Sequence, residues 1–337
     1  MPVNYKKHIK RKLHRTRKFL FKPAALKRMD VRGTAAPRVR AQSPGKEPAV
    51  VYCAQEATFP EEAFRRMGDA WDRDFSGLFP PGIKVMVKIN LNTADPYPGS
   101  TSPETAAALV DFLRAKGITD ITVGDCSGNH SLPTIRTARK NGMKKALKGR
   151  ARFSFFDSEP WFEVPLEGSM LGKVTVPQSA LEAERLISLA NLKTHCQADF
   201  SFGLKLAVGF MHPMERYALH RDCLREKIAE ISLAVPSDLT IIDGRTAFVT
   251  GGPDRGVEAR GEVIIFGTNP LAVDIQAYRV LYALKESRGC LECFHEDPFQ
   301  MAQLRHARAI GIGGAAWEGY RLEKIQPLKF RSIMSSS

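Results

Sequence analysis

The feature that most constrains this fold is a repeated alternation of short apolar strands with helical segments, which begins at Ala49. Strand-like runs lie at 49–53, 83–90, 120–125, 152–156, 173–176, 184–195, 238–243 and 262–267, and helical spacing marks 60–75, 101–117, 225–235 and 270–285. Strands that alternate with helices predict an α/β fold, with a parallel or mixed sheet covered by helices on both faces. The pattern also allows two Rossmann-like halves.

The clearest helix is predicted over 101–117. Thr101 and Glu104 fit a capping box, Pro103 suits the first turn, and Gly117 ends the segment.

The predicted strands end in polar residues. In open α/β sheets, ligands bind outside the carboxyl ends of the strands, so these side chains should converge on one site. We expect the strand in "ERLISLANLKTH" to end near Asn191, and the strand in "DLTIID" to end at Asp243. The strand-end residues are Lys88, Asn90, Asp125, Asn191, Lys193 and Asp243.

The segment from Leu189 to His220 adds proton-active groups to this predicted site. Two lysines can hold a carboxylate or phosphate, and an imidazole can move protons near neutral pH. We therefore predict that His195, Asp125 and Asp243 are catalytic. We predict that Lys88, Asn90, Lys193, Lys205 and His220 bind the substrate, and that Lys193 and Lys205 contribute little to packing.

The turn "GDCSGNH" places Cys126 and His130 after a strand. These residues form either a nucleophile pair or a polar turn with a small buried cysteine, and we favour the turn.

The net charge of +14 comes almost entirely from one end of the chain. Residues 1–40 hold 14 Lys and Arg and one acid, and the remainder is close to neutral. We predict a basic, disordered or partly helical arm and linker over 1–48, a body over 49–320 that could divide near residue 180, and a tail over 321–337. The arm suits RNA or an anionic membrane through residues 6–40, and we expect residues 1–40 to be dispensable for folding.

Six scattered cysteines and the lack of a secretory signal or apolar membrane span predict a reduced, cytoplasmic protein, although organelle targeting by the arm stays open. Cys290 and Cys293 form one C-x-x-C motif. This motif is half of a zinc or iron–sulfur site, so a divalent metal or a cluster is a candidate cofactor if other ligands join.

Several segments, in this order, resemble the domain-of-unknown-function 362 family: "VKINLN", "LISLANLKTH", "FGLKLAVGF", "ERYALH" and "NPLAVDIQAYRVL". The resemblance spans about Val50 to Gly313. It implies an association with iron–sulfur chemistry, which many members have through a ferredoxin-like module. This chain lacks the cysteine run of that module, lacks a twin arginine, and has Leu206 where the family pattern suggests asparagine. The layout is also distantly similar to that of nickel-pincer-type lactate racemases, at the level of fold only.

Three functions follow as hypotheses. The first is an intracellular enzyme that acts on a small anionic molecule by lysine binding and His/Asp acid–base chemistry. The second is a metal or iron–sulfur redox protein that uses Cys290 and Cys293. The third is a nucleic-acid- or membrane-associated protein that uses the arm, and a homo-oligomer is compatible with each of them.

Overall fold

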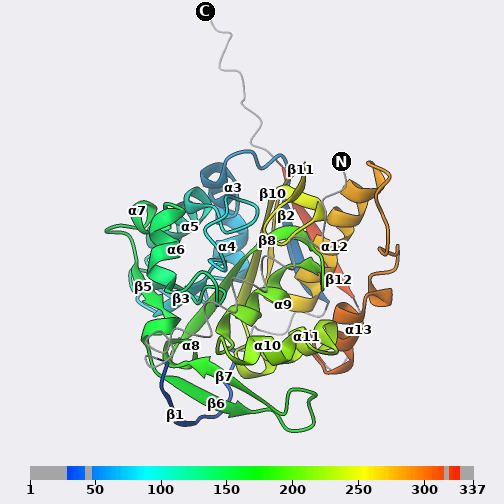
Figure 1. The fold of residues 1–337 in the computed structure, drawn as a ribbon. Coiled ribbons are helices and arrows are strands. Elements are labelled where there is room, and N and C mark those ends of the chain that lie inside the picture. The colour runs from blue at the N-terminus through cyan, green and yellow to red at the C-terminus, as the bar shows by residue number, and fades with distance from the viewer. Residues whose placement is uncertain (1–28, 42–47, 315–318, 327–337) are drawn as a thin grey trace, which may run out of the picture.

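The computed structural model of the protein is built around a nine-stranded mixed sheet. The structure describes residues 29–41, 48–314 and 319–326. The strands follow the path β12-β2-β11-β10-β8-β3-β4-β5, and β9 pairs with β8 (Figure 1). Their bounds are β2 Ala49–Ala54, β3 Val85–Lys88, β4 Ile121–Asp125, β5 Arg152–Phe155, β8 Arg185–His195, β9 Asp199–Ser201, β10 Leu239–Gly251, β11 Gly256–Gly267 and β12 Tyr320–Ile325.

The strand directions confirm the predicted mixed α/β sheet. Strands β10, β8, β3, β4 and β5 are parallel neighbours. Strand β11 runs antiparallel to both β10 and β2, and β2 is parallel to β12. Because β8 pairs with β3, and β2 lies between β11 and β12, strands from both predicted lobes share one sheet.

Helices cover both faces of this sheet, as predicted. The alternation in β3 shows why: Val85 and Val87 enter one apolar cluster and Met86 enters the other. One face carries α3 Pro60–Arg66, α4 Gly68–Asp74, α5 Pro103–Ala115, α6 Thr134–Lys140 and α7 Met143–Ala146. The other carries α9 Gly203–Leu206, α10 Glu215–Leu219, α11 Leu224–Ala234, α12 Pro270–Glu286 and α13 Ala302–Ala309.

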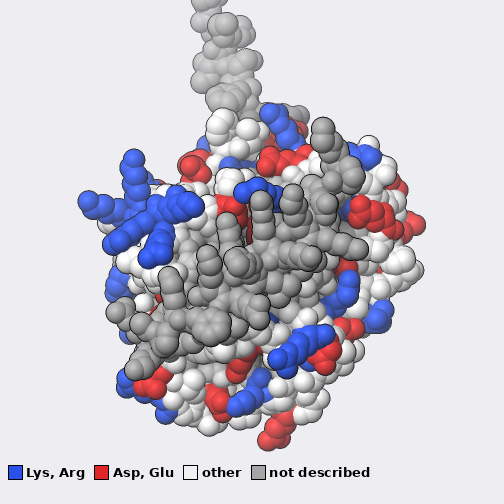
Figure 2. All heavy atoms as spheres, in the orientation of Figure 1, with Lys and Arg blue, Asp and Glu red and all other residues white. Residues whose placement is uncertain are grey.

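Short elements complete the chain. They are α8 Gln178–Leu181 and the 3₁₀ turns η1 Phe156–Ser158, η2 Ala207–Phe210 and η3 Pro298–Gln300. None of the helices in the described ranges has both the length and the apolar composition needed to cross a membrane. Charges of both signs are mixed over much of the visible surface, but Lys and Arg gather beside α7 (Figure 2).

A second, three-stranded sheet corrects the predicted boundary of the arm. Its strands are β1 Val31–Thr34, β6 Trp161–Pro165 and β7 Lys173–Pro177, and β1 pairs in parallel with β6. Residues 29–41 are therefore packed on the body. Residues 1–28 lie outside the described residues.

The segment 29–41 is also fixed by a buried ion pair. The guanidinium of Arg38 pairs with the carboxylate of Asp238, and both side chains are almost fully buried. The same carboxylate accepts the backbone N–H groups of Ala41 at 2.8 Å and Leu186 at 2.7 Å. The expectation that residues 1–40 are dispensable for folding is therefore wrong for this part of the arm.

Four further boundaries differ from the sequence prediction. The predicted tail begins inside β12, which pairs along its whole length with β2. Strand β8 continues to His195 and β10 to Gly251, so neither ends where it was expected. The cap of α5 is Ser102, whose hydroxyl accepts from the Thr105 N–H at 3.2 Å, because the Thr101 hydroxyl already accepts from the Asn90 N–H at 2.8 Å.

Replacing Arg38 with Met should lower the free energy of unfolding by about 3–5 kcal/mol, because it leaves the Asp238 carboxylate buried without its cation. Chemical denaturation of the full chain measures this. Arg32→Met on the same segment is the matched control, because Arg32 and its partner Asp30 are exposed and its loss should change stability little. Equal stability of the two variants would contradict the role of the buried pair.

Candidate functional site

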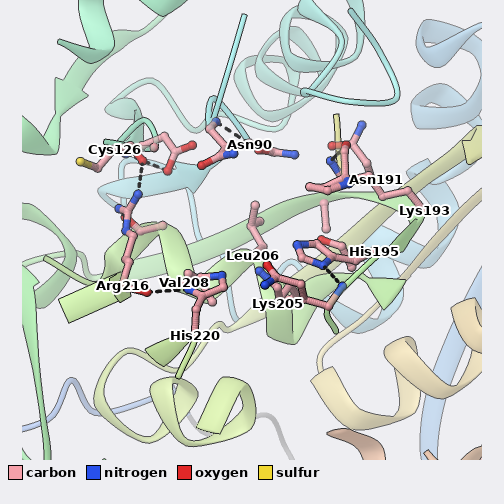
Figure 3. Close-up of a pocket in the computed structure, with 18 of the residues that line it drawn as sticks. Asn90, Cys126, Asn191, Lys193, His195, Lys205, Leu206, Val208, Arg216 and His220 are labelled. Atoms are coloured by element: carbon pink, nitrogen blue, oxygen red, sulfur yellow. Dashed lines mark hydrogen bonds between the residues drawn. The ribbon is translucent and has the colours of Figure 1, made fainter. Parts of the chain in front are cut away.

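A pocket of about 300 Å³ lies at the carboxyl ends of β3, β4 and β8. Strands supply one part of its wall, and α9, η2 and α10 supply another (Figure 3). It brings together seven of the eight residues predicted to be catalytic or substrate-binding. These are Lys88, Asn90, Asp125, Lys193, His195, Lys205 and His220.

Strand β8 is the main carrier of these groups. Its pairing with β3 stops at Ser188, but it stays paired in parallel with β10 as far as Lys193, so its last residues continue past the end of β3. Alternation along the strand puts Asn191, Lys193 and His195 on one face. This is why three polar residues at spacing two line the same pocket.

A buried ion pair forms the floor of the site. The ammonium of Lys88 lies 2.7 Å from Oδ1 of Asp125, and both side chains are nearly inaccessible to solvent. Lys88 Nζ also donates to the Ile89 carbonyl at 2.8 Å, and the Asp125 carboxylate accepts the N–H groups of Leu91 and Cys126. Burial lowers the pKa of Lys88, and the Asp125 carboxylate opposes that effect.

Gly209 allows η2 to close over this pair. A Cβ at this position would lie 2.3 Å from Lys88 Nζ and 2.4 Å from Asp125 Oδ1. The next residue, Phe210, puts its ring centroid 5.3 Å from the same ammonium, a cation–π distance. A side chain at position 209 would overlap the Lys88–Asp125 pair, so this point of the "LKLAVGF" segment requires glycine.

Arg216 on α10 joins the two walls. Its guanidinium donates to the carbonyls of Met211, Cys126 and Gly209 at 2.9–3.0 Å and of Ser127 at 3.2 Å. It is buried, and its hydrogen-bond partners among the described residues are all backbone carbonyls, which do not neutralise its charge. Sequence reasoning did not assign this residue to the site, because a contact with carbonyls leaves no pattern of paired charges.

Lys193 holds two loops together. Its ammonium donates to the carbonyls of Gly99 at 2.6 Å and Pro253 at 3.0 Å, and its side chain is buried. Pro253 belongs to the turn between β10 and β11 and lines the pocket. The expectation that Lys193 contributes little to packing is therefore wrong, whereas Lys205 is half-buried.

Asp274 on α12 holds the helix that carries Lys205. Its buried carboxylate accepts the N–H groups of Gly203 at 2.9 Å and Leu204 at 3.0 Å, the first two residues of α9. Burial raises the pKa of Asp274 to about 7, although both N–H contacts favour the charged form. The sequence offered no signal for this residue, since it lies inside a predicted helix.

The two pocket histidines are held in opposite tautomers. Nδ1 of His195 accepts the N–H groups of Gln197 and Ala198 at 3.2 Å each, so the proton of the neutral ring is on Nε2. Nδ1 of His220 lies 2.5 Å from the Arg216 carbonyl, which can only accept, so in that ring Nδ1 carries the proton. In neutral form, Nε2 of His195 is a donor and Nε2 of His220 an acceptor.

Two oxygen atoms of pocket residues lack hydrogen-bond partners among the described residues. They are Oδ1 of Asn191 and the hydroxyl of Tyr217, and both are buried. The Nδ2 group of Asn191 donates to the Ser100 carbonyl at 3.1 Å, which fixes the orientation of the amide. Each unmet acceptor costs about 1–3 kcal/mol until a donor reaches it.

Asp243 is absent from the pocket lining, so its predicted catalytic role is corrected. It accepts from the hydroxyls of Tyr97 at 2.8 Å and Thr105 at 2.6 Å, and it pairs with Arg245 at 2.9 Å. Because β10 continues to Gly251, this carboxylate lies inside the strand and ties it to α5. Its partners account for its burial without a ligand.

The cysteines of the C-x-x-C motif and of the "GDCSGNH" turn lie in two different places. Cys290 and Cys293 follow α12 and do not line the pocket, and the described part of the chain has no group of three His, Cys, Asp or Glu residues that could hold a metal. Cys126 and His130 both line the pocket. Burial raises the pKa of Cys126 to about 12, which favours the polar-turn interpretation of "GDCSGNH" over a nucleophile.

Gly209→Ala should lower the free energy of unfolding by about 1–3 kcal/mol, because the added methyl group overlaps the Lys88–Asp125 pair. Gly77→Ala is the matched control, since nothing lies within 4 Å of its Cβ position. Urea unfolding of both variants measures the difference. If Gly209→Ala is as stable as the control, the pair does not require this glycine.

Asp274 should make stability depend on pH near neutrality. Between its ordinary pKa of about 4 and its folded pKa of about 7, the folded state holds a proton that the unfolded state has lost. The wild-type free energy of unfolding should therefore fall as pH rises through this window, and Asp274→Asn should lack that component. Thermal unfolding of both proteins at mildly acidic and mildly alkaline pH tests this. A difference in stability between them that is constant with pH would contradict it.

Comparison with known proteins supports the family resemblance. A family model described as Domain of unknown function (DUF362) matches residues 85–279, more than half of the chain. Thylakoid-associated protein sll1697 from Synechocystis sp. is 25% identical over 195 residues, which are 52% of this chain and 56% of that protein, so the chain matches about half the length of this relative. A solved structure of the lactate racemase apoprotein from Thermoanaerobacterium thermosaccharolyticum has 14% identity and a TM-score of 0.42, and the match covers 72% of this chain and 60% of the other. The chain therefore belongs to the DUF362 family.

Proposed function

We propose that this protein is an enzyme that binds a small anionic molecule in the pocket, removes a proton from it with His220 and stabilises the resulting charge with a hydrogen bond from His195. The observation that supports this proposal is the set of charged side chains that line the pocket. Its lining includes four basic side chains, Lys88, Lys193, Lys205 and Arg216, and one carboxylate, Asp125, which already pairs with Lys88. Such a lining favours a carboxylate or phosphate ligand.

Lys205 is the best-placed residue for the anion. Lys88, Lys193 and Arg216 are buried, so a bound molecule can reach little of each side chain. Lys205 is half-buried, on a helix whose start is held by Asp274. It therefore combines a charge with a rigid support, while the other three cations add to the potential.

The two histidines supply a base and a hydrogen-bond donor. Nε2 of His220 can take a proton from the bound molecule, and the Nε2–H of neutral His195 can donate a hydrogen bond to the oxygen on which negative charge then develops. A ligand that also carries a hydroxyl or amino group supplies the donor that the buried acceptors of Asn191 and Tyr217 lack. The proposed substrate is thus a small acid with at least one further hydrogen-bond donor.

Binding is tested with Lys205→Gln by thermal shift and calorimetry against phosphate, succinate, malate, propionate and glycerate. Loss of a charged hydrogen bond should weaken binding of the preferred acid by about 10- to 100-fold. Lys84→Gln is the control, because Lys84 is exposed and precedes β3 at the end remote from Lys88. Glycerate should bind more tightly than propionate. Equal affinity of Lys205→Gln and the control would overturn the anion site.

Proton transfer is tested by NMR of deuterium exchange from D₂O into the acid that binds. His195→Phe, which removes the Nε2–H donor, and His220→Gln, which removes the base, should each slow exchange by about 100-fold or more while binding changes little. If both variants exchange deuterium at the wild-type rate, the pocket only binds the acid, and the proposed proton transfer is wrong.

A further inference from the structure

The gathering of basic side chains beside α7 belongs to one stretch of the sequence. Between Cys126 and Phe156 there are eight Lys and Arg and no Asp or Glu. We call this set the basic α6–α7 surface. Its members are Arg136, Arg139, Lys140, Lys144, Lys145, Lys148, Arg150 and Arg152.

The burial pattern directs these charges outward. Thr137, Ala138, Met143 and Leu147 are buried, and the last three belong to the apolar cluster on this face of the sheet. Helix α7 contacts both α5 and α6, so the two short helices are fixed to the body. Seven of the eight basic side chains are exposed, and Lys144 is half-buried. Figure 2 shows Lys and Arg projecting at this edge of the molecule.

Most of these cations have no acidic partner within the part of the chain that the structure describes. Arg150 pairs with Asp111, and Arg152 pairs with Asp120. The other six make no ion pair with any residue in the described ranges. Holding six like charges together is unfavourable, so the surface gains free energy when an anionic partner covers it.

We propose that the basic α6–α7 surface docks on an anionic phospholipid bilayer. The surface projects rather than forming a groove. Five of its cations lie on α6 and α7, and the other three lie in the turn after α7 and at the start of β5, so it suits a plane of phosphate and carboxylate head groups. No large apolar side chain of 126–156 is exposed: the rings of Phe153 and Phe155 are half-buried and stack on each other, which favours a plane of head groups over stacked nucleotide bases.

Docking of this kind is electrostatic and reversible. Each basic residue near an anionic membrane strengthens binding by about fivefold at low salt. The attraction fades once the Debye length, about 10 Å at 0.1 M salt, falls to about 3 Å at 1 M. The surface is separate from the two pocket histidines, so docking and catalysis are independent claims.

The test is co-sedimentation of the full chain with vesicles of phosphatidylcholine alone or mixed with phosphatidylserine. The patch variant carries Arg139→Gln, Lys140→Gln, Lys145→Gln and Lys148→Gln. The matched control carries Arg65→Gln, Lys84→Gln, Arg288→Gln and Arg305→Gln, which remove the same charge from exposed positions elsewhere. Equal melting temperatures establish that all proteins are folded.

The wild type and the control should bind the mixed vesicles at low salt and release them at about 1 M salt. The patch variant should bind about 100-fold or more weakly than the control, because four adjacent charges are lost. Equal binding of the two variants, or no binding of the wild type to mixed vesicles, would overturn the proposal. Patch-dependent binding to RNA without binding to vesicles would overturn it in favour of a nucleic-acid partner.

Discussion

The buried pair of Lys88 and Asp125 is the constraint on which the pocket depends. Each residue is the last of its strand, and parallel pairing of β3 with β4 brings the two ends together. Removing both charges from water is costly, so the pair is tolerable only when its remaining hydrogen-bonding groups are satisfied. The carbonyl of Ile89 and the N–H groups of Leu91 and Cys126 satisfy them, which fixes the loops that follow both strands. Gly209 and Arg216 then bring the opposite wall against these loops.

Strand ends predicted most of the candidate site because chain direction and pairing are enough to collect them. Lys88, Asn90 and Asp125 end short strands, and a polar residue there is readable in the sequence. The same reasoning failed at Asp243, because β10 continues for eight residues through a sequence that mixes glycine and polar residues with apolar ones. Its carboxylate stays inside the strand because Arg245, two residues further on, and Tyr97 and Thr105, from an earlier part of the chain, surround it. Such partners cannot be deduced from local pattern.

Two other features were missed because they depend on contacts far apart in sequence. Residues 29–41 look like a continuation of the basic arm, yet Arg38 meets Asp238 in the interior 200 positions away. Residues 320–325 look like a tail, yet they complete the sheet beside β2. Charge was misjudged for a different reason. The body is nearly neutral on average, and that average conceals the acid-free run from Cys126 to Phe156, which was visible in the sequence.

The roles of the two histidines depend on backbone geometry that residue types do not specify. His195 and His220 are alike in sequence terms, but the N–H groups after β8 and the carbonyl of Arg216 select opposite tautomers. The two side chains also differ in their exposure to solvent. His195 is 7% exposed, whereas His220 is exposed to solvent. A proton that His220 takes from a bound molecule can therefore pass directly to water. His195 keeps its Nε2 proton, because the two N–H groups at Nδ1 exclude a second proton on the ring, and its burial strengthens the hydrogen bond that Nε2 donates. The exposed histidine thus exchanges protons with solvent, whereas the buried one stabilises the charge that forms on the ligand.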